Sequence, residues 1–333
     1  MPPSAPPDDR GRGPSEITAA KVGVPAISVI VPTFRRPELL AACLSALGAQ
    51  TVAAEAFEVV VVDDGSGDAT PRALERAAAR MPGLRSITHP VNRGPAAARN
   101  RAVAEARGDL LLFLDDDIAA TPTLVSEHLA LHSVGPSGQP GYVAGQGYVG
   151  RVEWLPSLTV TPFMRWLDAT PLQFRYECGL EPGPVGAPEQ AFYTCNLSMC
   201  RSDFVAAGGF DERFPYPAYE DIELGFRLGR SGFRLSYAPQ ALAYHARAIT
   251  LDVFAGRMEK VGESAVLAAA SHPELPLTTE LDDPPGAAAS AAIRVLAAVR
   301  PSLFGRDVRS RHFWNTVERA YARGVRRGRA LTL

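Results

Sequence analysis

The chain has 333 residues, of which 34 are basic, 36 are acidic and 46% are hydrophobic. This length allows one large domain or two smaller ones with a well-formed core. The near balance of charge excludes the basic field typical of proteins that bind nucleic acid or anionic membranes, and the four cysteines show neither a C-x-x-C pair nor a zinc spacing. We therefore expect a soluble globular enzyme with no nucleic-acid partner, and the cytoplasm is the simplest location for it.

The first segment of the chain is not expected to fold. Residues 1–23 are rich in Pro, Asp and Arg and have no apolar core, so we predict a disordered tail over residues 1–24 and no targeting peptide. Residues 286–299 are weakly apolar, but the segment is short and Arg294 interrupts it. Because a bilayer crossing needs roughly 20 apolar residues, the protein is not expected to be integral to a membrane.

Apolar strands alternate with helical stretches in the first half of the chain. The pattern predicts strands at 27–31, 57–62, 84–88 and 110–114, with helices at 37–47, 71–80 and 96–106 between them. This alternation indicates a mainly parallel sheet, in which ligands bind at the carboxyl ends of the strands.

The second half of the chain differs in composition and in its pattern of predicted elements. Residues 136–150 and 179–190 are rich in Gly and Pro and are expected to be loops. Further on, the pattern predicts strands at 193–200, 233–237 and 241–245, a helix at about 221–230, and mainly helical structure from residue 251.

Carboxylates follow two of the buried strands. Asp63 and Asp64 come after the strand at 57–62, and Asp115, Asp116 and Asp117 come after the strand at 110–114. Like charges crowded together disfavour one another's ionisation, whereas a divalent cation favours carboxylate oxygens and substrate phosphates. The pair of acidic strand ends therefore indicates metal-assisted nucleotide chemistry; the alternative is that the acids only cap the loops after the strands.

The order of the motifs resembles glycosyltransferase family 2, whose members have the GT-A fold. Each of the matching pieces is weak evidence alone, but six in the right order, between residues 27 and 245, are specific. The pieces are Ser28-Val-Ile-Val-Pro-Thr-Phe-Arg35, Val61-Val-Asp-Asp-Gly-Ser66, Asn92-Arg-Gly-Pro-Ala-Ala-Ala-Arg-Asn100, Phe113-Leu-Asp-Asp-Asp117, Gly208-Gly-Phe-Asp211 and Glu220-Asp-Ile-Glu-Leu-Gly-Phe-Arg227.

The resemblance implies a fold class and a division of the chain. The expected fold is α/β: a Rossmann-like, mainly parallel sheet flanked by helices, with a C-terminal helical extension. A GT-A domain is expected over residues 25–250, with a nucleotide-binding half at 25–120 and an acceptor half at 121–250. Residues 251–333 are expected to form the helical region. Its basic end is compatible with three roles: it contacts a membrane surface, it contacts a partner, or it lies beside the acceptor cleft.

The resemblance also implies a nucleotide-sugar donor, with uridine as the expected nucleoside. Asp64 would accept a hydrogen bond from the uracil imide N–H, whereas Asp63 is expected to bind backbone N–H groups of the turn at Gly65 and Ser66. Arg99 would face the same pocket or be a surface cation on its helix. The residues expected to flank the base are Pro32, Thr33 and Arg35, although Arg35 and Arg36 can equally belong to a solvated loop.

The D-x-D triplet implies a bound Mn²⁺ or Mg²⁺. Asp115 would contact ribose or metal, Asp117 would coordinate the cation that bridges both phosphates, and Asp116 would point away or hold a supporting hydrogen bond. His245 follows a predicted strand, and the resemblance makes it the third ligand, which favours Mn²⁺; its alternative is a structural role.

Two further histidines, His128 and His132, lie four residues apart on a predicted helix. They could form a metal pair. We expect a solvated helix face instead.

Glu220 and Asp221 stand at a predicted helix start, where acids also stabilise the free N–H groups. In an inverting transfer, a carboxylate removes the proton of the acceptor hydroxyl as that oxygen attacks. The resemblance makes Asp221 this general base and Glu220 a neighbour that positions acceptor or base. Asp211 would bind acceptor hydroxyls or cap its turn.

Departures from the family pattern narrow the activity. The Q-x-x-R-W segment of processive members is absent, so we expect a hexosyl- or N-acetylhexosaminyl-transferase that moves a single sugar to an unidentified acceptor hydroxyl. Cys195 stands where many relatives have Gly, which leaves acceptor-side details open.

Three alternative functions fit the sequence less well. A sugar nucleotidyltransferase would need a Gly-rich loop at 32–37, and a phosphatase would need Thr where Ala119 stands. A non-catalytic nucleotide-sugar-binding protein would not need Asp221.

Overall fold

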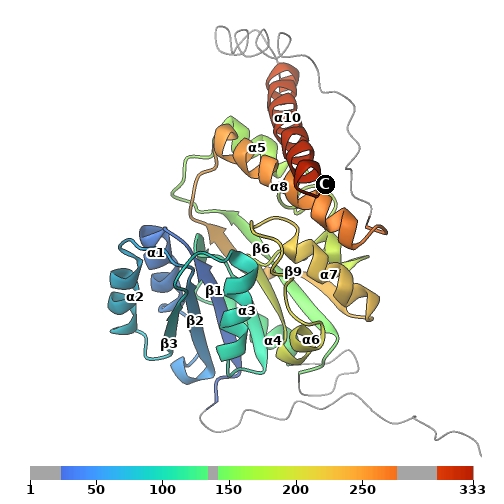
Figure 1. Cartoon of the computed structure of the whole chain (residues 1–333). Coiled ribbons are helices and arrows are strands. Elements are labelled where there is room, and N and C mark those ends of the chain that lie inside the picture. Colours follow the sequence, from blue (N-terminus) through green and yellow to red (C-terminus); the bar gives the residue numbers. More distant parts are fainter. Residues whose placement is uncertain (1–23, 134–141, 276–305, 333) are drawn as a thin grey trace, which may run out of the picture.

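The computed structural model describes residues 24–133, 142–275 and 306–332, and within them one mixed sheet forms the centre of the molecule (Figure 1). Neighbouring strands follow the order β3-β2-β1-β4-β8-β6-β9-β5, and β7 pairs with β9. The strands are β1 (Ile27–Thr33), β2 (Phe57–Asp63), β3 (Leu84–Thr88), β4 (Leu110–Leu114), β5 (Ile118–Ala120), β6 (Gln146–Trp154), β7 (Gly183–Pro184), β8 (Asn196–Cys200) and β9 (Arg234–His245).

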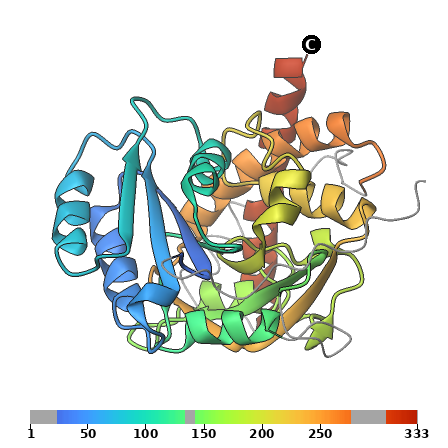
Figure 2. The same cartoon turned by 90° about the horizontal axis from the view of Figure 1, so that it is seen from below.

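Helices cover both faces of the sheet, as the view in Figure 2 shows for the parallel strands. The first four strands pair in parallel, and β8 runs antiparallel to β4 and β6. The helices are α1 (Pro37–Leu47), α2 (Thr70–Ala78), α3 (Pro95–Glu105), α4 (Leu124–His132), α5 (Pro162–Asp168), α6 (Arg201–Ala206), α7 (Glu220–Arg230), α8 (Leu251–Ser271) and α10 (Arg306–Thr332).

Alternate residues of the central strands build two separate cores. Val29 and Val59 pack with α1 on one face of the sheet, whereas Ile30 and Val60 pack with α3 and α7 on the other. A strand buried on both faces needs an uninterrupted apolar run, which explains the composition of β2 and β4. The predicted fold class is confirmed, and the acidic ends of β2 and β4 lie at the same edge of the sheet.

A third apolar cluster joins α5, α8 and α10, which lie together in the upper part of Figure 1. None of the helices in the described parts of the chain combines the length and apolarity that a membrane crossing requires. The tail predicted over residues 1–24, apart from residue 24, and the weakly apolar segment at 286–299 lie outside the described residues.

The second half of the sheet differs from the sequence-based expectation. The predicted strands at 233–237 and 241–245 are one strand, β9, and β6 begins at Gln146 inside a predicted loop. The pairing of β6 with β9 jumps from Gly150–Ala238 to Arg151–Leu242. Pro239 falls in the skipped stretch, where its missing N–H interrupts no ladder bond. The bulge therefore lets one strand continue through a sequence that resembles two.

The expectation of a solvated face for His128 and His132 is wrong, because both side chains are buried. Ser198 Oγ lies 2.8 Å from His128 Nδ1 and 2.9 Å from His132 Nε2, and Asn196 Oδ1 lies 2.9 Å from His128 Nε2. The amide of Asn196 also donates to the carbonyls of Arg151 and Ala241. The pair therefore anchors α4 to the sheet.

This buried pair makes stability depend on pH. Burial lowers the pKa of His128 to about 4 and that of His132 to about 3, whereas unfolded histidines titrate near 6.5. Between those values the unfolded chain binds more protons, so the free energy of unfolding should fall by about 5 kcal/mol, shared between the two histidines, as pH drops from 6.5 to 4. Urea denaturation across this range measures it. His132→Phe should flatten the curve, and a slope unchanged by that substitution would contradict the assignment.

Candidate active site

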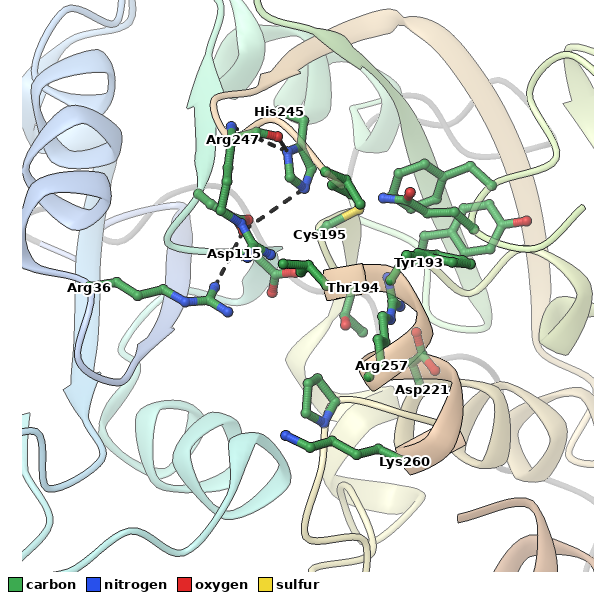
Figure 3. A pocket seen from close by; sticks show the side chains of 18 of the residues that line it. Arg36, Asp115, Tyr193, Thr194, Cys195, Asp221, His245, Arg247, Arg257 and Lys260 are labelled. Carbon is green, nitrogen blue, oxygen red and sulfur yellow. Dashed lines mark hydrogen bonds and ion pairs between the residues drawn. The ribbon is translucent and has the colours of Figure 1, made fainter. Parts of the chain in front are cut away.

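A cavity of about 440 Å³ opens at the carboxyl end of β4. Asp115 and Asp117 enter it from the loop after β4, and His245 enters it from the end of β9 (Figure 3). On the other side, Asp221 comes from the start of α7 and Arg257 from α8. The cavity therefore joins acidic residues that are more than 100 positions apart in the chain.

Strand pairing brings the D-x-D loop to His245. The short strand β5 follows Asp117 directly and pairs antiparallel with β9, with Ile118 opposite His245. The backbone N–H of Ala246 then donates to the carbonyl of Asp117 at 2.8 Å. The position of the imidazole beside the carboxylate is thus fixed by backbone hydrogen bonds.

Asp117 is a carboxylate of the cavity with three basic side chains around one oxygen. Its Oδ2 lies 3.3 Å from Arg36 Nη1, 3.3 Å from Arg247 Nε and 3.8 Å from His245 Nε2. The side chain is buried. The two guanidinium groups place positive charge beside a single oxygen, and a bound cation would also supply positive charge there.

His245 is held in the tautomer that a metal ligand needs. Its Nδ1 donates to the carbonyl of Arg247 at 2.9 Å, which leaves the lone pair on Nε2 directed at Asp117. Burial lowers the pKa of His245 and so favours the neutral ring. Ligand atoms lie about 2 Å from such ions, so a 3.8 Å separation fits two ligands of one ion. The described residues contain no preassembled group of three His, Cys, Asp or Glu ligands. Phosphate oxygens of a bound nucleotide would therefore have to complete the coordination shell of a metal ion.

Arg99 joins the metal side of the cavity to the helix start of α7. Its Nη2 donates to Asp115 at 2.7 Å and its Nη1 to Glu220 at 3.0 Å. The guanidinium is buried and lines this cavity, so the surface alternative is wrong, whereas a role of Arg99 toward the nucleotide stays a prediction. Glu220 is also buried, and burial raises its pKa, although Arg99 opposes the shift.

Asp221 is the member of the acidic pair that is available to a ligand. Tyr219 adopts φ 68°, a left-handed conformation that turns the chain into α7. Oδ1 of Asp221 accepts only from its own neighbour, the N–H of Ile222, at 2.8 Å. Burial raises its pKa, as suits a base that must hold a proton. Glu220 is engaged by Arg99, whereas Asp221 is not paired with a cation.

Asp116 turns away from the cavity. It accepts from Thr33 Oγ1 at 2.8 Å and from Arg36 Nη1 at 3.0 Å, and burial raises its pKa to about 6. The hydroxyl of Thr33 is therefore used to hold the D-x-D loop. Asp116 supports the loop, and the residues that line the cavity do not include it.

The residues predicted to surround the base lie outside the cavity lining. Asp64 is buried and accepts from the backbone N–H groups of Arg93 and Gly94, at 2.9 Å and 2.8 Å, and its Oδ1 lies 2.8 Å from His89 Nδ1. Its role toward a base stays a prediction. The structural role of Asp63 is confirmed, because it accepts from the N–H of Ser66 at 3.0 Å.

Three other predicted residues have local partners or lie apart from the cavity. Arg35 has φ 54° and donates from Nε to the carbonyl of Ser66 at 3.2 Å. Asp211 forms a surface ion pair with Arg213. Pro32 lies within β1 and, like Arg35 and Asp211, is absent from the cavity lining.

Sequence reasoning missed the cations that face the acids. Arg36 and Arg247 contact Asp117, and α8 adds Arg257 and Lys260 to the opposite wall. The three-residue spacing of Arg257 and Lys260, one helical turn, was a signal that they share a face. Nothing in the sequence indicated that this face of α8 closes the cavity.

Comparisons with known proteins agree with this architecture. The family model described as glycosyl transferase family 2 matches residues 28–186, and the model of glycosyltransferase-like family 2 matches residues 189–270. The validoxylamine A glucosyltransferase of Streptomyces hygroscopicus subsp. jinggangensis is 32% identical over 235 residues, which cover 67% of this chain and 56% of that protein. The pre-mycofactocin glycosyltransferase of Mycobacterium tuberculosis is 30% identical over 66% of this chain and 43% of its own. The chain thus spans about half the length of these curated relatives.

Two solved structures share the fold. A mannosyltransferase from Pyrobaculum calidifontis, in complex with GDP-Man and Mn²⁺, superimposes with a TM-score of 0.59 at 18% identity, over 92% of this chain and 87% of its own. TarS from S. aureus, in complex with UDP-GlcNAc, gives 0.52 at 18% identity, over 92% and 90%. At this identity the likeness shows a GT-A-like fold.

Proposed function

Because the chain belongs to glycosyltransferase family 2, we propose that it is a metal-dependent, inverting transferase that moves a single sugar from a nucleotide sugar to an acceptor hydroxyl. Uridine is the proposed nucleoside. The observation that carries the proposal is that Asp117, His245 and Asp221 line one cavity. A metal-binding pair and an unpaired carboxylate in one cavity are the two parts that an inverting transfer requires.

The donor diphosphate is assigned to the side of the cavity at Asp117 and His245. Together with Asp115, these residues would hold Mn²⁺ or Mg²⁺, and the bound ion would stabilise the charge that develops on the departing nucleoside diphosphate. Arg247 and Lys260 add fixed positive charge to the same cavity. Such charges favour a dianionic diphosphate and orient it before the reaction.

Asp221 is assigned as the general base. It is directed into the cavity and has no cation at hydrogen-bond distance, so its carboxylate is free to accept a proton. As the acceptor oxygen attacks the anomeric carbon, its proton passes to the Asp221 carboxylate while the bond between sugar and phosphate breaks. Glu220 holds Arg99, which in turn holds Asp115, so Glu220 positions the metal side of the site.

The coarse division of the chain follows from these assignments. Residues 25–120 supply Asp115 and Asp117 for the donor, and residues 121–250 supply Asp221 for the acceptor and His245 for the metal. A hexose or an N-acetylhexosamine is the proposed sugar, and the glucosyltransferase among the relatives supports a hexose.

Donor turnover in water tests the proposal. The purified chain is incubated with UDP-glucose, UDP-N-acetylglucosamine or GDP-mannose, with Mn²⁺ or with EDTA, and nucleoside diphosphate release is measured. We expect slow, Mn²⁺-dependent release of UDP. Turnover that requires pyrophosphate would indicate a nucleotidyltransferase, and tight binding of UDP-sugars with no turnover, even with acceptors, would indicate a sensor; either result contradicts the proposal.

A further inference from the structure

A second cavity, of about 570 Å³, adjoins the donor cavity. Five residues line both of them, and these form the partition between the two spaces: Gln173, Tyr193, Pro217, Asp221 and Arg257. Asp221 is one of the shared residues, so the second cavity extends to the residue that we assign as the general base.

The far wall of this second cavity comes from α10, which contributes Trp314, Val317, Glu318 and Tyr321. Glycines let α10 cross α8 with the two backbones in contact. A Cβ on Gly262 would lie 2.2 Å from the carbonyl oxygen of Tyr321, a separation that real atoms do not adopt.

Aromatic packing also fixes α10. The ring centroid of Trp314 lies 5.3 Å from that of Trp166, and Phe313 lies 5.2 Å from Phe163, so α10 packs on α5 as well. Phe163, Trp166 and Phe313 belong to the third apolar cluster. The wall is therefore built by tertiary packing of α10 against α5 and α8.

The lining is chemically suited to a polyhydroxylated ring. Trp314, Tyr193 and Tyr219 are aromatic residues of the lining, a residue type that packs well against the C–H side of a ring. The side-chain carboxylates of Glu189 and Glu318 make no hydrogen bond or ion pair with the described residues, so both are free to accept hydrogen bonds from ligand hydroxyls.

Gln173 adds a second, independent sign of a missing ligand. Its Oε1 is buried and accepts no hydrogen bond from the described parts of the chain. A buried acceptor without a donor is costly, by about 1–3 kcal/mol. The side chain stands at the junction of the two cavities, where a ligand hydroxyl would satisfy it.

We propose that this second cavity is the acceptor site, that α10 completes it, and that the acceptor is a small, neutral, polyhydroxylated ring compound of the size of a mono- or disaccharide. The proposal rests on the transferase function assigned above. The volume lies within the range of small-molecule pockets, about 300–1,000 Å³. Three carboxylates, those of Glu189, Asp221 and Glu318, and two guanidinium groups, those of Arg175 and Arg257, line the cavity, so their charges nearly cancel, which favours a neutral ligand over an anionic one.

Binding of p-nitrophenyl glycosides tests the site without requiring turnover. Saturation-transfer NMR is recorded with α- and β-glucosides, galactosides and mannosides, in the presence of UDP and Mn²⁺, for the full chain and for Trp314→Ala, Trp314→Phe and Glu318→Gln. We expect at least one glycoside to bind, with affinity lowered about tenfold in Trp314→Ala and restored in Trp314→Phe. Glu318→Gln, at an exposed position, should weaken binding without affecting folding.

The matched control is Arg323→Ala, which lies on α10 like Trp314 and Glu318 but does not line the cavity, and which removes only a surface ion pair with Glu259 of α8. It should bind the glycosides as the unaltered chain does. Absence of binding by every glycoside, or binding that the Trp314 and Glu318 variants leave unchanged, would overturn the proposal. An equal loss of UDP affinity in Trp314→Ala would also overturn it, because α10 would then belong to the donor site. Donor turnover in water is a separate readout, so failure of the transferase assignment is distinguishable.

Discussion

Asp221→Asn should bind UDP in the presence of Mn²⁺ within about twofold of the unaltered chain, while sugar transfer falls by about 10³-fold. The amide keeps the shape of the side chain, and its oxygen can still accept from the N–H of Ile222 at the start of α7. The local fold therefore persists, whereas the group that accepts the hydroxyl proton is gone. Calorimetry with UDP and a transfer assay measure the two effects.

The neighbouring acid provides the control for this assignment. Glu220→Gln leaves Arg99 with one carboxylate partner, Asp115, instead of two, so its main effects should be lower stability and weaker donor binding. If Glu220→Gln lost transfer while donor binding stayed intact, and Asp221→Asn remained active, Glu220 would be the base instead.

Asp117→Ala should abolish the Mn²⁺-dependent part of UDP binding, a loss of at least about 100-fold. Asp117 is the carboxylate that His245 faces, and its removal leaves the imidazole without a second protein ligand at that distance. It also leaves Arg36 and Arg247 facing a vacant position, so weak binding of UDP that does not depend on the metal should remain. Titrations of UDP with Mn²⁺ and with EDTA separate the two contributions.

Glu38→Ala is the charge-matched control, because Glu38 is exposed in the first turn of α1 and lies outside the cavity. It should bind UDP as the unaltered chain does. Mn²⁺-dependent affinity that survives in Asp117→Ala would remove the ion from this part of the sheet and would refute the metal assignment.

The first half of the fold was predictable because its strands are covered on both faces. Such strands need continuous apolar sequence, and β2 and β4 each run directly into acidic residues. Parallel pairing then forces the ends of these strands to one edge. The alternation of strands and helices along the chain and the shared edge therefore followed from local sequence, and so did the contact of Asp63 with its own turn.

The second half depends on contacts between distant segments, which leave little local signal. The partners of His128 and His132 are about 70 residues further along the chain, so a buried polar pair looked like a solvated helix face. In the same way, the bulge at Pro239 depends on β6, and the place of Arg257 and Lys260 in the cavity depends on how α8 docks. Asp211 was chosen from its motif, and its ion pair with Arg213 keeps it on the surface.

Helix α8 contributes residues to both cavities, and Arg257 lines each of them. If donor and acceptor fill these two cavities, Arg257 borders both ligands. A change in the rotamer of Arg257 when one ligand binds would then alter the contacts that the other ligand makes. Thermodynamic linkage makes that influence reciprocal: the factor by which the diphosphate changes acceptor affinity must equal the factor by which the acceptor changes diphosphate affinity. A single helix can therefore couple the affinities of the two ligands without movement of one domain against another.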